Sequence, residues 1–271
     1  MPKFNWTWDD FEQAAMTIKE KAGKWGGNGL SNEQIWKSLY LGLGQWAFAD
    51  NGYELGYTDD APFIDHLKRV LRLQKAGAVA DRAEQLATYE GKSVEQQPLA
   101  IGKSAIDSFW SNQVVAVQTA AGEARTIKLV PLPRPVGGKS SNYIKPSQFF
   151  SVTRDSKAPE EAAKFISFFT NDVAANEALF AERGVPISSK IREALTPKLG
   201  PSQKVMFDYV AEVSKDVQPI RPADPPGAAD LFKNVFTPQV VDPVLFEKLS
   251  PEDAVALLRK EATAILAKNK K

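Results

Sequence analysis

The chain of 271 residues contains no cysteine and a single histidine, His66. The lack of cysteine excludes disulfide bonds, thiolate metal ligands and cysteine nucleophiles, and it leaves the cellular compartment open. His66 lies in the sequence PFIDHLKRVL, a helical pattern with polar neighbours. We therefore expect an ordinary histidine at a surface or a helix edge, and neither a metal ligand nor a catalytic base.

Long apolar runs and an excess of one charge are also missing. No apolar stretch approaches the ~18 residues that a membrane span requires, and Met1 to Lys21 lacks the apolar region of a signal peptide. The 34 lysine and arginine residues nearly cancel the 33 aspartate and glutamate residues. This balance gives no electrostatic reason to expect nucleic acid or an anionic membrane as a partner.

Motifs of catalysis are scarce as well. The chain has no Gly-x-Ser-x-Gly elbow, phosphate-binding P-loop or His-Glu-x-x-His motif. Adjacent acidic residues occur where helices are expected to begin, so capping and the helix dipole explain them. These pairs are Asp9-Asp10, Asp59-Asp60 and Glu160-Glu161. None resembles the separated acid and base of a glycosidase, and the sequence predicts neither an enzyme nor a metal or cofactor site.

What the sequence does contain is a series of helix starts and β-prone runs. Thr7 can cap a first helix and Asn32 a second, which we expect to carry both Trp36 and Trp46. A chain of this length suits one large domain or two small ones. Three apolar runs are expected to form strands: Ala105–Phe109, Thr126–Val130 and Ser147–Thr153.

The stretch from Tyr143 to Lys190 is the most informative part of the chain. It predicts a strand, a tight turn, a helix and a return loop, in that order. Pro159 can begin the helix, because a first turn does not need the N–H group that proline lacks. Apolar residues then recur at helical spacing, so one face of this helix is expected to be buried. They are Ala162, Phe165, Ile166 and Phe169.

This order of elements resembles the extracellular solute-binding proteins of sugar-type ABC importers. The resemblance extends over most of the chain, through three further segments that are similar in order and spacing to those of the family. They are Thr7 to Lys21, Ile101 to Gln113 and Ser250 to Lys268. The resemblance implies an α/β fold rich in helix, the two-lobed type II clamshell of periplasmic binding proteins.

The resemblance also implies how the lobes divide the chain. Residues 1–142 would begin the second, C-terminal lobe, residues 143–186 would return through the first lobe and the hinge, and residues 187–271 would close the second lobe. Family members start with a signal and a first-lobe segment, so we expect a truncated form with an incomplete N-terminal lobe. Its implied partners are a carbohydrate and the permease subunits of an importer, and its implied state is an extracytoplasmic monomer in the periplasm or a cell-surface lipoprotein.

A carbohydrate site needs flat aromatic faces and planar polar groups. The resemblance places Trp110, with Asn112 beside it, where an aromatic ring stacks on the ligand; the alternative is a core tryptophan at a sheet edge. Trp36 and Trp46 are further candidates, although tryptophan at helical spacing is more often a core residue. Trp6 and Trp8 are expected to have no binding role.

Four polar or amphipathic residues complete the candidate site. Tyr143 lies in the loop that the resemblance places under the cleft. Glu182 and Arg183 could grip hydroxyls or a carboxylate, or could cap a helix and pair with each other. Asp224 could accept from a sugar hydroxyl, or could cap the helix that follows it.

Two other functions remain open, a carbohydrate-active hydrolase with an α/β core and a helical interaction domain whose family likeness is accidental. The second predicts no strand next to Trp110. If the first lobe is incomplete, part of the apolar surface of Ser147–Thr153 and of the following helix should be exposed, with one strand edge unpaired.

Overall fold

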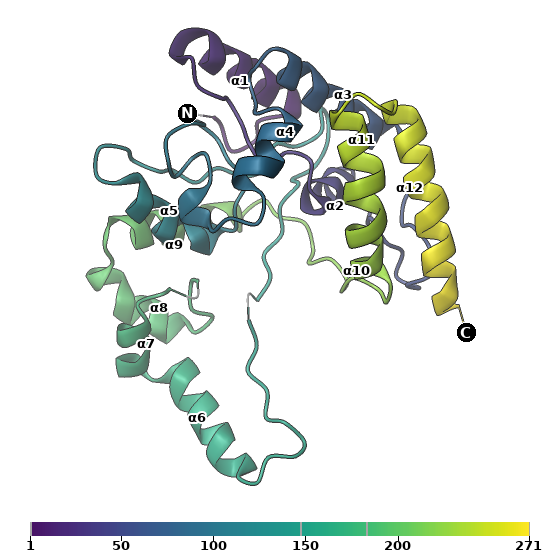
Figure 1. Cartoon of the computed structure of the whole chain (residues 1–271). Coiled ribbons are helices and arrows are strands. Elements are labelled where there is room, and N and C mark those ends of the chain that lie inside the picture. Colours follow the sequence, from purple (N-terminus) through teal and green to yellow (C-terminus); the bar gives the residue numbers. More distant parts are fainter. Residues whose placement is uncertain (1, 147, 183, 271) are drawn as a thin grey trace. The chain divides into compact units, whose positions relative to one another are not determined.

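The computed structural model describes residues 2–146, 148–182 and 184–270, and the chain divides into two compact units (Figure 1). Unit 1 comprises Met1–Ser108, Val130–Tyr143 and Asp216–Lys271. Unit 2 comprises Phe109–Leu129 and Ile144–Lys215. The predicted lobes remain a prediction; the compact units divide the chain differently, because 109–129 joins 144–186 and unit 2 continues to Lys215.

Side-chain caps fix the starts of several helices of unit 1. Thr7 begins α1 in a capping box with Asp10, Asn32 begins α2, and Ser250 begins α12. A π-helical segment, Phe232–Val241, connects α10 to α11 and packs along α12 (Figure 1). The main helices of unit 1 are α1 (Trp8–Ala22), α2 (Glu33–Gly42), α3 (Ala61–Lys75), α4 (Arg82–Glu84), α10 (Ala228–Leu231), α11 (Asp242–Leu245) and α12 (Pro251–Leu266).

Trp36 of α2 is at the centre of the core of unit 1. Its side chain has no exposed surface, and its indole N–H donates to the Tyr57 hydroxyl at 3.2 Å. Five aromatic rings surround it with centroids 5.6 to 6.5 Å away, those of Phe48, Tyr57, Phe63, Phe232 and Phe236. Such a cluster contributes both apolar burial and ring contacts to stability.

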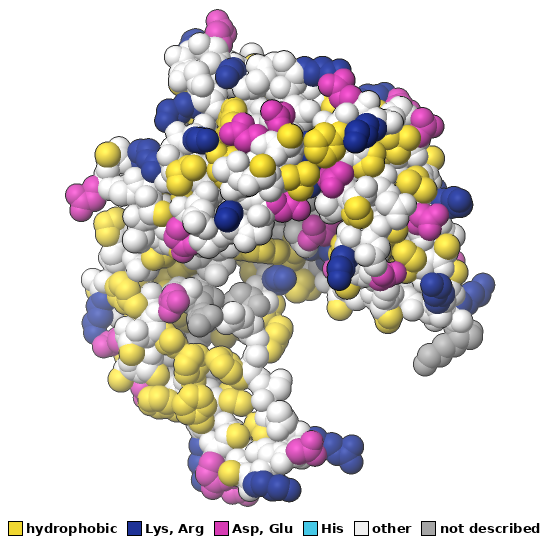
Figure 2. Space-filling view, in the orientation of Figure 1, with side chains coloured by type: hydrophobic (Ala, Val, Ile, Leu, Met, Phe, Trp, Pro, Cys, Tyr) yellow, Lys and Arg dark blue, Asp and Glu magenta, His cyan; other side chains and the backbone are white. Residues whose placement is uncertain are grey.

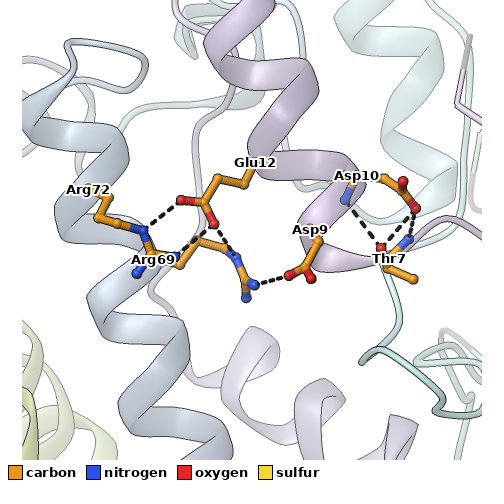
Figure 3. Close-up of polar contacts among 6 residues, drawn as sticks. All are labelled: Thr7, Asp9, Asp10, Glu12, Arg69 and Arg72. Carbon is orange, nitrogen blue, oxygen red and sulfur yellow. Dashed lines mark hydrogen bonds and ion pairs between the residues drawn. The ribbon is translucent and has the colours of Figure 1, made fainter.

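Ion pairs hold α1 against α3 (Figure 3). Both Arg69 and Arg72 donate to the Glu12 carboxylate, at 2.9 Å and 2.7 Å from their Nε atoms, and Arg69 also contacts Asp9. The hydrogen bond from Arg72 is the main reason that the pKa of Glu12 lies below its usual value. The acidic residues of the α1 start therefore have structural partners, in agreement with their predicted structural role.

The expectation of a surface or edge position for His66 was wrong. Its side chain is 1% exposed, its Nε2 atom lies 2.7 Å from the Leu30 carbonyl oxygen, and Trp8 packs edge-on at 4.6 Å. Burial lowers the pKa of His66 to about 4. The polar neighbours in the sequence misled the prediction, because His66 lies on the face of α3 that is turned to the core.

The described residues of unit 2 form five α-helices: α5 (Val114–Ala121), α6 (Pro159–Asn171), α7 (Val173–Leu179), α8 (Ser189–Leu195) and α9 (Pro201–Val213). Helix α6 starts at Pro159 as predicted. The buried face that we expected for it is absent, since α6 carries no buried residue. Phe165 and Phe168 are 58% and 52% exposed, and hydrophobic side chains gather on the surface over α6 and α7 (Figure 2).

The three predicted strands do not form within the described residues, which contain only isolated β-bridges. Ala105–Phe109 follows a single bridge between Ser104 and Trp25. In Thr126–Val130, the Ile127 N–H donates to the Gln118 side chain instead of a strand. Ser147 lies outside the described residues, and 148–153 has no neighbouring strand. A strand requires a ladder of paired backbone groups, and each segment lacks a neighbour that supplies one.

The exposure expected for this third segment is observed. Phe149 is 81% exposed, Phe150 48% and Val152 36%. Against α6, Phe150 makes a ring contact with Phe169, at 4.8 Å between centroids. Both the segment and the helix thus present apolar surface to solvent.

Candidate functional site

Five polar side chains of unit 1 form a group that contains two cations, a carboxylate, a hydroxyl and an amide. The group joins helix α2 to the loop 217–227 and to the end of the segment 130–143. Its members, which we call the loop–α2 cluster, are Gln34, Lys37, Tyr143, Arg221 and Asp224.

Lys37 is the most buried member of the cluster. Its side chain is 1% exposed, and its Nζ lies 2.5 Å from Asp224 Oδ2, while the Asp224 side chain remains 41% exposed. The Phe232 ring lies beneath the ammonium group, 4.4 Å from Nζ to the centroid. Burial lowers the pKa of Lys37, although the hydrogen bond and the charge of Asp224 oppose this shift.

Arg221 connects the loop to the other two members. Its Nη2 donates to the Gln34 side-chain oxygen at 3.0 Å and to the Tyr143 hydroxyl at 2.5 Å. The guanidinium also lies over the Tyr143 ring, 4.7 Å from the centroid. A backbone bridge between Tyr143 and Gln218 fixes the two segments side by side. The proline residues at 219, 222, 225 and 226 make this loop stiff, because each fixes its own φ angle.

The structure brings two of the predicted site residues together in this cluster, Tyr143 and Asp224. Asp224 does not cap the helix after it, because α10 begins after Gly227 without a side-chain cap. Trp36 has no exposed face and belongs to the core, which is the alternative reading of its position. Trp46 is half-buried and lies beyond α2, which ends at Gly42. The prediction that one helix carries both tryptophans was therefore wrong.

A turn explains why α2 ends early. Gly44 adopts a positive φ of 75°, which glycine tolerates and most residues do not. The Gln45 N–H then donates to the Tyr40 carbonyl at 2.9 Å.

Unit 2 carries the other predicted residues. Trp110 is 45% exposed, and its ring lies 4.7 Å from Lys145 Nζ. Asn112 is half-buried in the short 3₁₀ turn Ser111–Gln113, and Glu182 is exposed. Arg183 lies outside the described residues. Trp110 is thus partly accessible, with the Lys145 ammonium group over its ring.

Sequence reasoning missed Gln34, Lys37 and Arg221. A buried lysine is rare unless it is paired, and its partner lies 187 residues away. One signal was present, since Arg221 and Asp224 both lie in the proline-rich loop that already contained a candidate.

A second polar feature of unit 1 lies apart from the predicted residues. Asp107 accepts from the Asn28 amide at 3.1 and 3.2 Å and from the Ser108 N–H at 2.9 Å. Both side chains line a cavity of about 50 Å³, otherwise walled mainly by aromatic, aliphatic and proline side chains. Burial raises the pKa of Asp107 to about 6. The hydrogen bonds oppose this shift, and so they hold the carboxylate in place without restoring its usual acidity.

Trp6 and Trp8 also line this cavity. Both are buried, and the Trp6 indole N–H donates to the Pro131 carbonyl at 2.8 Å. In the part of the chain that the structure describes, no group of three histidine, cysteine or acidic side chains is placed to hold a metal ion. No helix among these residues is long and apolar enough to cross a membrane.

Two cations, a carboxylate, a hydroxyl and an amide thus lie along helix α2, the loop 217–227 and the end of the segment 130–143. The chain belongs to the bacterial extracellular solute-binding proteins, whose family model matches residues 1–198. An accidental family likeness, which the interaction-domain alternative required, is thereby ruled out.

Solved structures show the same relationship. A family 1 extracellular solute-binding protein from Alicyclobacillus acidocaldarius is 28% identical, with a TM-score of 0.81. The match covers 97% of this chain and 65% of that protein, so the chain spans somewhat less than two thirds of its relative.

Two more distant structures share the fold. A periplasmic solute-binding protein from Pectobacterium atrosepticum is 17% identical with a TM-score of 0.80, and the match covers 99% of this chain and 68% of that one. A periplasmic oligogalacturonide-binding protein from Yersinia enterocolitica, solved with saturated digalacturonic acid, is also 17% identical, with a TM-score of 0.79. That match covers 100% of this chain and 68% of the other.

Proposed function

We propose that the protein binds a carbohydrate, with an oligosaccharide as the favoured size, and that it acts without catalysing a reaction. The observation that carries the proposal is the loop–α2 cluster. The half-exposed Asp224 carboxylate can accept from sugar hydroxyls, and Arg221 donates to the Tyr143 hydroxyl of the same cluster. The saccharide bound by the Yersinia protein supports this class of ligand.

Trp110 of unit 2 supports the same proposal. Its accessible ring can stack on the C–H face of a sugar, and Asn112 offers an amide next to it. The nearby Lys145 ammonium adds a donor for ring or hydroxyl oxygens. Glu182 and Trp46 are secondary candidates, because their side chains are at least partly exposed.

Delivery to an ABC permease is the role that we propose for the bound state. Membership of an extracellular solute-binding family supports an extracytoplasmic location, in the periplasm or at a lipid-anchored position on the cell surface. Binding of detergent-solubilised permease in the presence of ligand, measured by pull-down, would test this role, and equal recovery without ligand would count against it.

We also propose that unit 2 contains an incomplete form of the first lobe. The exposed phenylalanine side chains of 148–153 and α6 support this, because soluble domains rarely expose such a contiguous apolar surface. The surface should bind the dye ANS, and replacement of Phe149 and Phe165 by serine should reduce the fluorescence severalfold. Unchanged fluorescence would contradict the proposal.

Isothermal titration calorimetry with a panel of neutral and acidic di- and trisaccharides tests the central proposal. We expect at least one ligand to bind, and Tyr143→Phe and Asp224→Asn each to weaken it about tenfold, because each removes a polar group that would contact the sugar. Tyr89→Phe serves as the matched control, since Tyr89 packs against Trp25 and not against the cluster. Binding that survives both cluster substitutions would place the ligand elsewhere.

A further inference from the structure

We propose that the solute carries a carboxylate, as the uronic-acid sugars do, and that Arg221 selects it. This inference rests on the function proposed above and names the ligand class for the same site. It follows from the charge of Arg221 and from the neighbours that surround it.

Arg221 differs from the other arginine residues of unit 1. It forms no ion pair with any carboxylate among the described residues, and its Nε–H is buried without an acceptor. Its two acceptors, Gln34 and Tyr143, are both neutral. Each of the other arginine residues of the unit has a carboxylate partner within 3 Å. They are Arg69, Arg72, Arg82, Arg134 and Arg259.

The acidic residues near Arg221 are already engaged. Asp224 is bound to the ammonium group of Lys37, which has almost no contact with water. Glu33 reaches Arg221 only through Gln34, whose amide donates to Glu33 Oε1 at 3.1 Å. A half-buried guanidinium without a countercharge has lost part of its hydration, and an anionic ligand would compensate for it.

The orientation of the Arg221 guanidinium also favours a carboxylate as its ligand. The Tyr143 ring beneath the guanidinium limits its rotation, so the N–H groups keep a fixed plane. Both Nη2–H groups are already donated to Gln34 and Tyr143, so an incoming carboxylate would accept charge-assisted hydrogen bonds from the Nη1–H groups. The Asp224 carboxylate and the Tyr143 hydroxyl remain suited to sugar hydroxyls, so acid and hydroxyl recognition would occur together.

Calorimetry of the full chain with digalacturonate and with its uncharged dimethyl ester tests the inference. We expect the ester to bind at least tenfold more weakly, since it cannot form the charged pair. In Arg221→Gln, digalacturonate should lose at least tenfold in affinity and the ester less than threefold, so that the preference disappears. Arg72→Gln, which breaks an ion pair remote in sequence from the cluster, should change neither affinity.

The possible results separate the inference from the proposed function. If the ester or a neutral oligosaccharide binds as tightly as digalacturonate, the carboxylate inference fails and sugar binding stands. If Arg221→Gln weakens both ligands by the same factor, with an unchanged circular dichroism spectrum, Arg221 does not select the acid and the inference fails. If no saccharide of either kind binds, both the inference and the proposed function are wrong.

Discussion

Unit 1 buries most of its aromatic side chains, whereas the aromatic side chains of unit 2 lie partly or largely in solvent. Of the rings around Trp36, those of Phe48, Tyr57, Phe63 and Phe236 have little accessible surface, and that of Phe232 is half-buried. The phenylalanine residues of 148–153 and α6 keep about half to four fifths of theirs, apart from the half-buried Phe169. Both units are helical, so the difference does not come from secondary structure. It shows that an amphipathic pattern predicts a buried face only where another element is present to cover it.

The largest contrast is expected from truncation of one aromatic side chain in each unit. Trp36→Ala should destabilise unit 1 by about 3–5 kcal/mol, because it removes the centre of a packed core. Phe168→Ala should change stability by less than about 0.5 kcal/mol, since its ring is half in solvent. Urea denaturation followed by circular dichroism measures both, and equal effects would remove the distinction between the units.

A smaller effect is expected from the Lys37–Asp224 pair of unit 1. Asp224→Asn should cost about 1–3 kcal/mol, because it leaves a buried ammonium group without its countercharge. Lys37→Met should cost less, since the half-exposed Asp224 can be hydrated when its partner is gone. The double variant should be close to Lys37→Met in stability. A larger loss for Lys37→Met than for Asp224→Asn would show that packing around the lysine stem matters more than charge.

The smallest effect concerns Asp107. Its pKa rises from 3.8 in the unfolded chain to about 6 in the folded one, so the folded state binds the proton more tightly. The protonated Asp107 side chain therefore stabilises the folded state fully below about pH 4, and this stabilisation is lost as the pH rises through 6. The free energy of unfolding of Asp107→Asn, relative to that of the wild type, should therefore rise by about 1 kcal/mol between pH 4 and pH 7. We expect no larger rise, because part of the Asp107 side chain remains accessible to water. Thermal unfolding of both proteins between pH 4 and pH 7 measures this, and a difference in melting temperature that does not change with pH would contradict it.

The helix starts were predictable because their determinants are local. Thr7, Asn32 and Ser250 accept hydrogen bonds from the first turn of the helix that each one precedes. Pro159 likewise marks the start of α6. Capping depends on residues three apart, and the sequence displays these directly.

The strands and the charged cluster were not predictable in the same way. A β-prone run such as 148–153 becomes a strand only if a partner lies beside it, and sequence propensity carries no information about that partner. Lys37 and Asp224 meet across 187 positions. The resemblance pointed to Tyr143 and the chemistry of a single carboxylate to Asp224, but Lys37 and Arg221 join them only in the folded chain.

The exposure of Trp110 gives the protein a built-in optical probe. Trp6, Trp8 and Trp36 are buried in unit 1, and Trp25 and Trp46 are half-buried there, whereas Trp110 in unit 2 is 45% exposed. Aqueous quenchers such as iodide should reach its indole first, and the Lys145 ammonium above the ring should draw the anion towards it. The exposed Trp110 should emit at the red edge of the spectrum and the buried tryptophans of unit 1 at the blue edge. Quenching at the red edge would therefore report on unit 2. A ligand that covers Trp110 should reduce iodide quenching at the red edge and leave quenching at the blue edge unchanged.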